Sequence, residues 1–131
     1  MRPVVHLLRR IRADRSGVSA LEFGILLPVF LALTFGIIQL GQAFWTQTAL
    51  QHAVEMAARC ATINSTTCGT TSSTQTYAAT QAYGLTFPAS TFVATTATCG
   101  NQVSATYSFP VTMAAWFPTT VSLSAQSCYP L

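Results

Sequence analysis

One long apolar stretch constrains this chain more than any other feature of its sequence. Between Phe23 and Leu40 the stretch contains no charged residue. Counted back to Val18, it is long enough to cross a hydrocarbon core of about 30 Å as a helix. Trp45 follows it, and tryptophan is enriched at the membrane–water interface. The pattern predicts a transmembrane helix over residues 18–45.

Two residues in this stretch are unusual for a membrane helix. Glu22 places a carboxylate on the first turns, and an ionisable group costs about 2.5–3.5 kcal/mol near a bilayer centre and less near the interface. Glu22 is therefore a functional candidate, and a polar residue near the headgroups is the simpler alternative. Pro28 cannot donate to the carbonyl of Gly24, so we expect a helix kink there, which membrane helices tolerate.

A short basic arm precedes the helix. Basic residues before a first hydrophobic helix keep that end in the cytoplasm, which predicts a cytoplasmic N-terminus and an extracytoplasmic remainder. The arm is short and has no aromatic partners, so we expect no nucleic-acid binding. Five of the six Lys and Arg residues lie in it, namely Arg2, Arg9, Arg10, Arg12 and Arg15.

The junction between arm and helix has a distinctive order of residues. Gly17 follows the arm, Glu22 is the fifth residue after it, and Phe23 comes next. This order resembles the processing site of type IV pilin-like precursors, which implies cleavage by a prepilin peptidase between Gly17 and Val18, with Glu22 and Phe23 as a processing and assembly motif. The alternative is that Gly17 only breaks the structure between arm and helix.

Three spaced blocks, residues 16–28, 36–43 and 51–59, narrow the resemblance to the TadE-like family, minor pseudopilins of the tight-adherence (Flp/Tad) pilus system. Gln39 stands where family members often carry Glu. The resemblance covers residues 9–60. It implies a bacterial inner-membrane protein with a periplasmic head, either in the membrane or incorporated in the pilus. It also implies a role in pilus assembly or priming, with other pilins or pseudopilins, the assembly platform and membrane lipid as partners.

The helix is expected to continue beyond the membrane. Apolar residues recur every fourth position at 49/50, 53/54 and 57/58, while Glu55 and Arg59 fall on another face in the favourable i,i+4 order. The predicted organisation is a leader over 1–17, a transmembrane helix over 18–45, an amphipathic extension over 46–60 and a head over 61–131.

The head contains no Asp, Glu, Lys or Arg and is rich in Thr and Ser. Its patterning predicts an α+β fold, in which the long helix is followed by a short helix and a three-stranded antiparallel sheet. An apolar loop over 110–118 contains Trp116 and Phe117, which cap the sheet or meet a partner. The expected elements are a loop over 64–73, a helix over 74–83 with Ser72 or Ser73 as N-cap and Gly84 after its end, and strands over 91–98, 102–109 and 121–129.

Four cysteines lie on the predicted extracytoplasmic side: Cys60, Cys68, Cys99 and Cys128. An even count in an oxidising compartment argues for two disulfides. Of the three possible pairings the spacing favours Cys60–Cys68 with Cys99–Cys128. The second bond requires the third strand to lie beside the first, or Cys128 to reach across. The absence of a Cys-x-x-Cys motif with a nearby His disfavours a metal site.

The ionisable residues are too few and too scattered for acid–base catalysis. The acids are Asp14, Glu22 and Glu55, and the histidines are His6 and His52, of which His52 is expected to be solvated or packed. We therefore expect neither enzymatic activity nor a cofactor. Two alternatives to the pseudopilin remain: an unprocessed single-span protein with an extracytoplasmic interaction domain, and a secreted head released by signal peptidase at residues 41–43.

Overall fold

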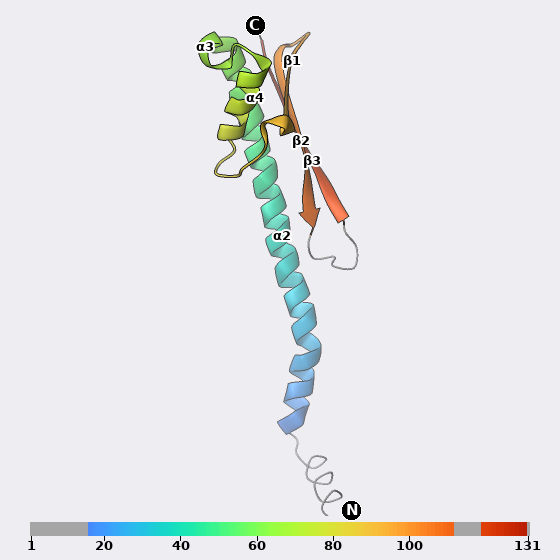
Figure 1. Cartoon of the computed structure of the whole chain (residues 1–131). Coiled ribbons are helices and arrows are strands. Elements are labelled where there is room, and N and C mark those ends of the chain that lie inside the picture. The colour runs from blue at the N-terminus through green and yellow to red at the C-terminus, as the bar shows by residue number, and fades with distance from the viewer. Residues whose placement is uncertain (1–15, 112–118, 131) are drawn as a thin grey trace, which may run out of the picture. The chain divides into compact units, whose positions relative to one another are not determined.

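The computed structural model describes residues 16–111 and 119–130. The chain divides into two compact units, Met1–Ile38 and Gln39–Leu131. The predicted α+β class is confirmed, because one long helix is followed by short helices and an antiparallel sheet (Figure 1). The described elements are α2 (Ser16–Ile63), α3 (Ser65–Cys68), α4 (Thr71–Thr80), the 3-10 turn η1 (Ala89–Thr91), β1 (Phe92–Ala97), β2 (Gly100–Val111) and β3 (Thr119–Tyr129).

Helix α2 contains both the apolar stretch and its amphipathic continuation. It is 48 residues long, a little longer at each end than the expected helix over 18–60, and it continues through Pro28. The kink at that proline stays a prediction.

Within the second unit, α2 has one buried face. Ala49, Leu50, Ala53, Val54, Ala57 and Ala58 are at most 1% exposed, as the four-residue spacing predicted. Glu55 and Arg59 lie on the exposed face. The small alanines allow neighbouring backbone to approach closely, and the buried face is the part of α2 that belongs to the core of the head.

The segment predicted as a loop over 64–73 is largely helical instead. Asn64 caps α3 by accepting from the Thr67 N–H at 3.1 Å. Thr70 caps α4 through a reciprocal capping box with Ser73, so α4 begins before the N-cap expected at Ser72 or Ser73 and ends at Thr80. That expectation was wrong because several Ser and Thr residues stand in a row, and only Thr70 has a partner three residues on that returns its hydrogen bond.

The three strands form an antiparallel meander in the order β1-β2-β3. All three predicted strands are present, although β2 extends to Val111, so Pro110 pairs with Thr120 in the sheet rather than beginning a loop. Trp116 and Phe117 lie outside the described residues.

One face of the sheet completes the core. Phe92, Val103, Ala105 and Ala125 are at most 5% exposed and cluster with the buried face of α2 and with Ala78 and Ala82. Side chains alternate along β2, where Val103 and Ala105 are buried and Thr106 is exposed, as the period of two requires. The opposite face of β2 therefore carries polar side chains.

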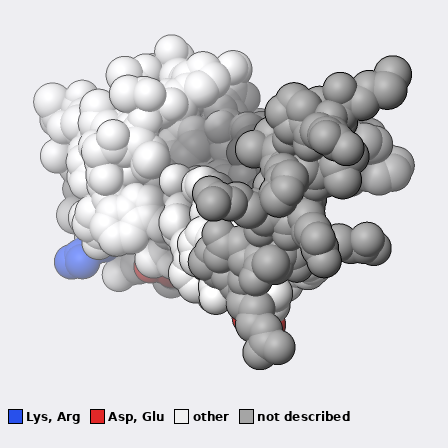
Figure 2. All heavy atoms as spheres, turned by 90° about the horizontal axis from the view of Figure 1, so that it is seen from below, with Lys and Arg blue, Asp and Glu red and all other residues white. Residues whose placement is uncertain are grey.

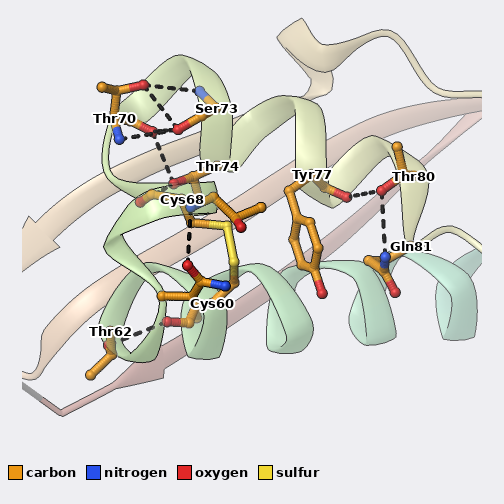
Figure 3. The surroundings of a disulfide bond; sticks show 12 residues. Cys60, Thr62, Cys68, Thr70, Ser73, Thr74, Tyr77, Thr80 and Gln81 are labelled. Carbon is orange, nitrogen blue, oxygen red and sulfur yellow. Dashed lines mark hydrogen bonds between the residues drawn. A yellow bond between two sulfur atoms is a disulfide. The ribbon is translucent and has the colours of Figure 1, made fainter.

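A disulfide joins Cys60, near the end of α2, to Cys68 at the end of α3, with the two Cα atoms 5.7 Å apart. Figure 3 shows the buried Thr74 beside this bond. The Thr74 hydroxyl lies 3.1 Å from the Cys68 carbonyl oxygen and 3.0 Å from that of Thr70. The bond therefore lies where the last turn of α2, α3 and the start of α4 meet.

A second disulfide joins Cys99 to Cys128, with the Cα atoms 6.3 Å apart. Strands β1 and β3 are not neighbours. The second of the two expected arrangements therefore holds, in which Cys128 reaches across to Cys99. The bond forms because Cys99 lies in the turn at the start of β2, and β2 pairs there with the end of β3, Gln102 opposite Cys128. Gly100 in this turn has φ +123°, and a Cβ there would collide with the Tyr129 carbonyl, so the position requires glycine.

Candidate functional site

The N-terminal part of α2 exposes its side chains on all sides. Every residue from Gly17 to Leu33 is exposed, including Leu21, Phe23, Ile25 and Phe30 at 64–66%. Burying apolar surface is worth about 25 cal/mol per Å², and the described chain does not bury these side chains itself. Among the described residues, α2 is the one helix long and apolar enough to cross a membrane.

The predicted cleavage site lies in the first turn of this helix. A Cβ at Gly17 would meet nothing within 4 Å, so the fold itself does not require glycine there. Gly17 is helical in the structure.

Glu22 lies one helical turn beyond Val18 on the same face, about 6 Å along the axis at 1.5 Å per residue. Its carboxylate is exposed, and no hydrogen bond or ion pair joins it to another described residue. Phe23 beside it is 65% exposed. The geometry therefore presents a carboxylate that is free to meet a positive group at the helix start, either its own or a neighbour's.

Further along the apolar segment, a polar side chain is hydrogen-bonded within the helix itself. The Thr34 hydroxyl donates to the Phe30 carbonyl at 2.8 Å, one turn back. This bond satisfies a hydroxyl that would otherwise cost free energy in hydrocarbon. Pro28 leaves the Gly24 carbonyl without its usual helical donor, and a Cβ at Gly24 would meet nothing within 4 Å.

His52 has a packing role rather than a place in a cluster of ligands. Its Nδ1 lies 3.0 Å from the Gln81 carbonyl oxygen, and its ring lies 4.2 Å from that of Tyr83. These contacts hold the segment after α4 against α2. No group of three His, Cys, Asp or Glu residues within the described ranges is arranged to hold a metal ion.

The i,i+4 order of Glu55 and Arg59 predicted an ion pair between them, and this prediction is wrong. Glu55 accepts a hydrogen bond from the Gln51 side chain at 2.9 Å, one turn in the opposite direction. Both charged residues are described, and no ion pair joins them. The i,i+4 rule gives only a few tenths of a kcal/mol, which a competing amide donor can offset.

A hollow of about 250 Å³ between the short helices and the sheet is not indicated by any sequence pattern. Its lining includes Thr70 and Thr74 from the helical side and Thr95, Asn101 and Gln102 from the sheet. These residues are far apart in sequence and share no motif. Only the packing of α3 and α4 beside β1 and β2 brings them together.

These observations define a chain with one apolar helix long enough to span a membrane, followed by a small disulfide-bonded α+β head. The model of a family described as TadE-like protein matches residues 17–59. Over that segment the chain is similar to TadE-like proteins, as its three spaced blocks predicted, and this similarity suggests involvement in the Tad pilus system.

The matched segment is α2 without its first residue and its last turn, and the head lies outside it. A search of curated proteins and of solved structures finds no significant match to the chain.

Proposed function

We propose that the protein is a minor pseudopilin that helps to assemble or prime a Flp/Tad-type adhesion pilus, after a prepilin peptidase cuts between Gly17 and Val18. The observation that carries this proposal is the start of α2, where Glu22 stands exposed in an apolar surface, one turn beyond Val18, inside the TadE-like segment. An uncompensated carboxylate in such a surface is costly, so it argues for a partner.

Cleavage after Gly17 would supply that partner. It would leave a positive amine on Val18, four residues before Glu22. The two groups can pair within one chain, in which case the carboxylate only neutralises its own N-terminus. In an assembly, Glu22 meets the amine of a neighbouring subunit instead. Because a charge left without its partner in an apolar environment costs several kcal/mol, this requirement fixes the register between neighbours.

The same processing changes the charge of the subunit. The leader carries five of the six basic residues, so its removal leaves a nearly neutral chain suited to lateral packing. The basic leader supports a cytoplasmic N-terminus. The two disulfides support an oxidising compartment for the head. The proposed location is therefore the bacterial inner membrane with a periplasmic head.

The mature N-terminus tests the proposal. Co-expression with the cognate prepilin peptidase is expected to give a chain that begins at Val18, determined by mass spectrometry of the N-terminal peptide. Gly17→Leu is expected to block cleavage. Gly24→Leu is the matched control and should still be cut, because it adds the same side chain at another position where a Cβ meets nothing within 4 Å.

The alternative is an unprocessed single-span protein whose head binds a partner outside the cytoplasm. The helical conformation at Gly17 favours this alternative, because a peptidase must first unwind that turn. A mature chain that begins at Met1 would support it. A chain that begins at Phe44 would instead indicate ordinary signal peptidase.

A further inference from the structure

One stripe of α2 within the second unit is left uncovered by the head. It lies opposite the buried face and recurs at helical spacing. Its ends carry Phe44 and Trp45, exposed by 65% and 59%, and Ile63, exposed by 64%. We call it the uncovered stripe, and it consists of the exposed residues Phe44, Trp45, Thr48, Glu55, Arg59 and Ile63.

The uncovered stripe holds all the charge of the second unit. Glu55 and Arg59 are the only Asp, Glu, Lys or Arg residues from Gln39 to Leu131. On the face seen in Figure 2, the described atoms carry only small blue and red areas on white. One acid and one base, a single turn apart, make this stripe self-complementary in charge.

Neither charge forms an ion pair with another residue that the structure describes. The Glu55 carboxylate turns toward Gln51, which donates to it at 2.9 Å, and no ion pair joins it to Arg59. Arg59 is exposed. Both groups are therefore available to a partner that offers the opposite charge at the matching height.

Each charge stands beside a hollow. The hollow at Glu55 has a volume of about 420 Å³ and is lined also by Thr48, His52 and Tyr83. The hollow at Arg59 has a volume of about 210 Å³ and includes Met56, Ile63 and Tyr77 in its lining. A shallow, open depression therefore lies beside each charge.

We infer that the uncovered stripe binds a second copy of this chain, with Glu55 of one copy paired to Arg59 of the next. The inference rests on the proposed function in one respect: copies anchored in one membrane must lie parallel. In parallel helices at equal height the two groups are four residues apart, about 6 Å at 1.5 Å per residue, and a stagger of that size brings them level.

A staggered parallel contact is head-to-tail. It uses the carboxylate of one copy and the guanidinium of the other, so no two-fold axis closes it, and the same contact can repeat along a series of copies. A two-fold axis along the membrane normal would also keep two copies parallel, but it holds them at equal height, where Glu55 of one copy and Arg59 of the other lie one turn apart. The charge pair would thereby set the axial offset between neighbouring heads.

Charge reversal in the full-length chain tests the inference. Two copies with different affinity tags are expressed together in the membrane, and the fraction of one that is co-isolated with the other is measured after mild detergent extraction. Glu55→Arg and Arg59→Glu should each reduce co-isolation of identical copies about tenfold, which corresponds to the low end of the coupling measured for close charge pairs across an interface.

Co-expression of the two variants with each other is the decisive measurement. A Glu55→Arg chain carries two bases and an Arg59→Glu chain two acids, so co-isolation of the unlike pair should return to the wild-type level. The double variant Glu55→Arg/Arg59→Glu should also restore it. Thr106→Arg and Thr106→Glu are matched controls, because they add the same charges on the exposed face of β2, and should change nothing.

The inference is overturned if either single reversal co-isolates like the wild type, or if the unlike pair is not restored. Reversals that abolish pili while leaving self-association intact would also overturn it, because the stripe would then bind a different subunit. Each result is separable from a failure of the proposed function, which is decided by the mature N-terminus and not by these residues.

Discussion

The two halves of α2 are made from the same kind of helix and have opposite surroundings. From Gly17 to Leu33 every residue is exposed, and most side chains are large and apolar. From Ala49 to Ala58 the apolar residues are mainly alanines with Leu50 and Val54, and they are buried by the head. The first half is apolar all round, whereas the second is apolar along one face.

This difference separates two sources of stability. Residues 39–131 contain a core, a sheet and two disulfides, so the chain itself supplies their contacts. The described chain does not cover the apolar surface of residues 17–38, and in the proposed assembly lipid or neighbouring subunits cover it. Substitutions in the first half should therefore change assembly, and substitutions in the second should change folding.

Glu22→Ala is the strongest test of this separation. Recruitment into the pilus assembly is expected to fail, while membrane insertion and, for the most part, cleavage persist, because the variant removes only the charge that selects a neighbour. Glu22→Gln should fail as well, since it keeps the shape and loses the charge. Piliation is measured by shearing and immunoblotting. A cleaved Glu22→Ala protein with wild-type piliation would reduce Glu22 to an interfacial residue without a role.

Phe92→Ala tests the head from its core. The Phe92 side chain is 0% exposed, and removing a buried Phe costs about 3–5 kcal/mol. The midpoint temperature of thermal unfolding, measured on the full chain in detergent micelles, should fall strongly. Ile37→Ala is the control from the first unit, because Ile37 is 72% exposed, and it should leave this transition unchanged. Equal shifts in the two variants would show that the units do not fold independently.

Each disulfide is removed by replacing both of its cysteines with serine. The loss of stability should be larger for the bond that closes the longer loop. Chain-entropy arguments give about 3.5 kcal/mol for a loop of the Cys99–Cys128 size and about 2.5 kcal/mol for one of the Cys60–Cys68 size, since the separations are 29 and 8 residues. The Cys99→Ser/Cys128→Ser protein should therefore be the less stable of the two double variants. Non-reducing peptide mapping checks the pairing directly. Four free thiols in protein from the cell envelope would contradict both bonds.

Thr70→Ala should have the smallest effect. It removes the N-cap of α4 and its reciprocal bond with Ser73, which is worth about 1 kcal/mol. The same thermal transition measures the loss. Thr76→Ala is a suitable control, since its hydroxyl only bonds back to the Ser72 carbonyl within the helix. A larger loss for Thr76→Ala than for Thr70→Ala would contradict the assigned cap.

The strands of the head were predictable because their apolar residues recur at a regular period of two. The alternation of Val103 and Ala105 with polar neighbours fixed a strand and its buried face, since one face must leave water. The start of α4 was not predictable in the same way. Ser72, Ser73 and Thr70 are all good N-caps, and the choice among them depends on hydrogen bonds that each makes only in the folded chain.

The sequence by itself determined the parts that depend on local chemistry. These are the length of the apolar helix, the position of Glu22 one turn beyond Val18, and the three strands, because helix and strand periods are properties of neighbouring residues. Only the tertiary structure decided how Cys128 reaches Cys99. That outcome depends on the order of the strands, which a linear spacing of residues does not specify.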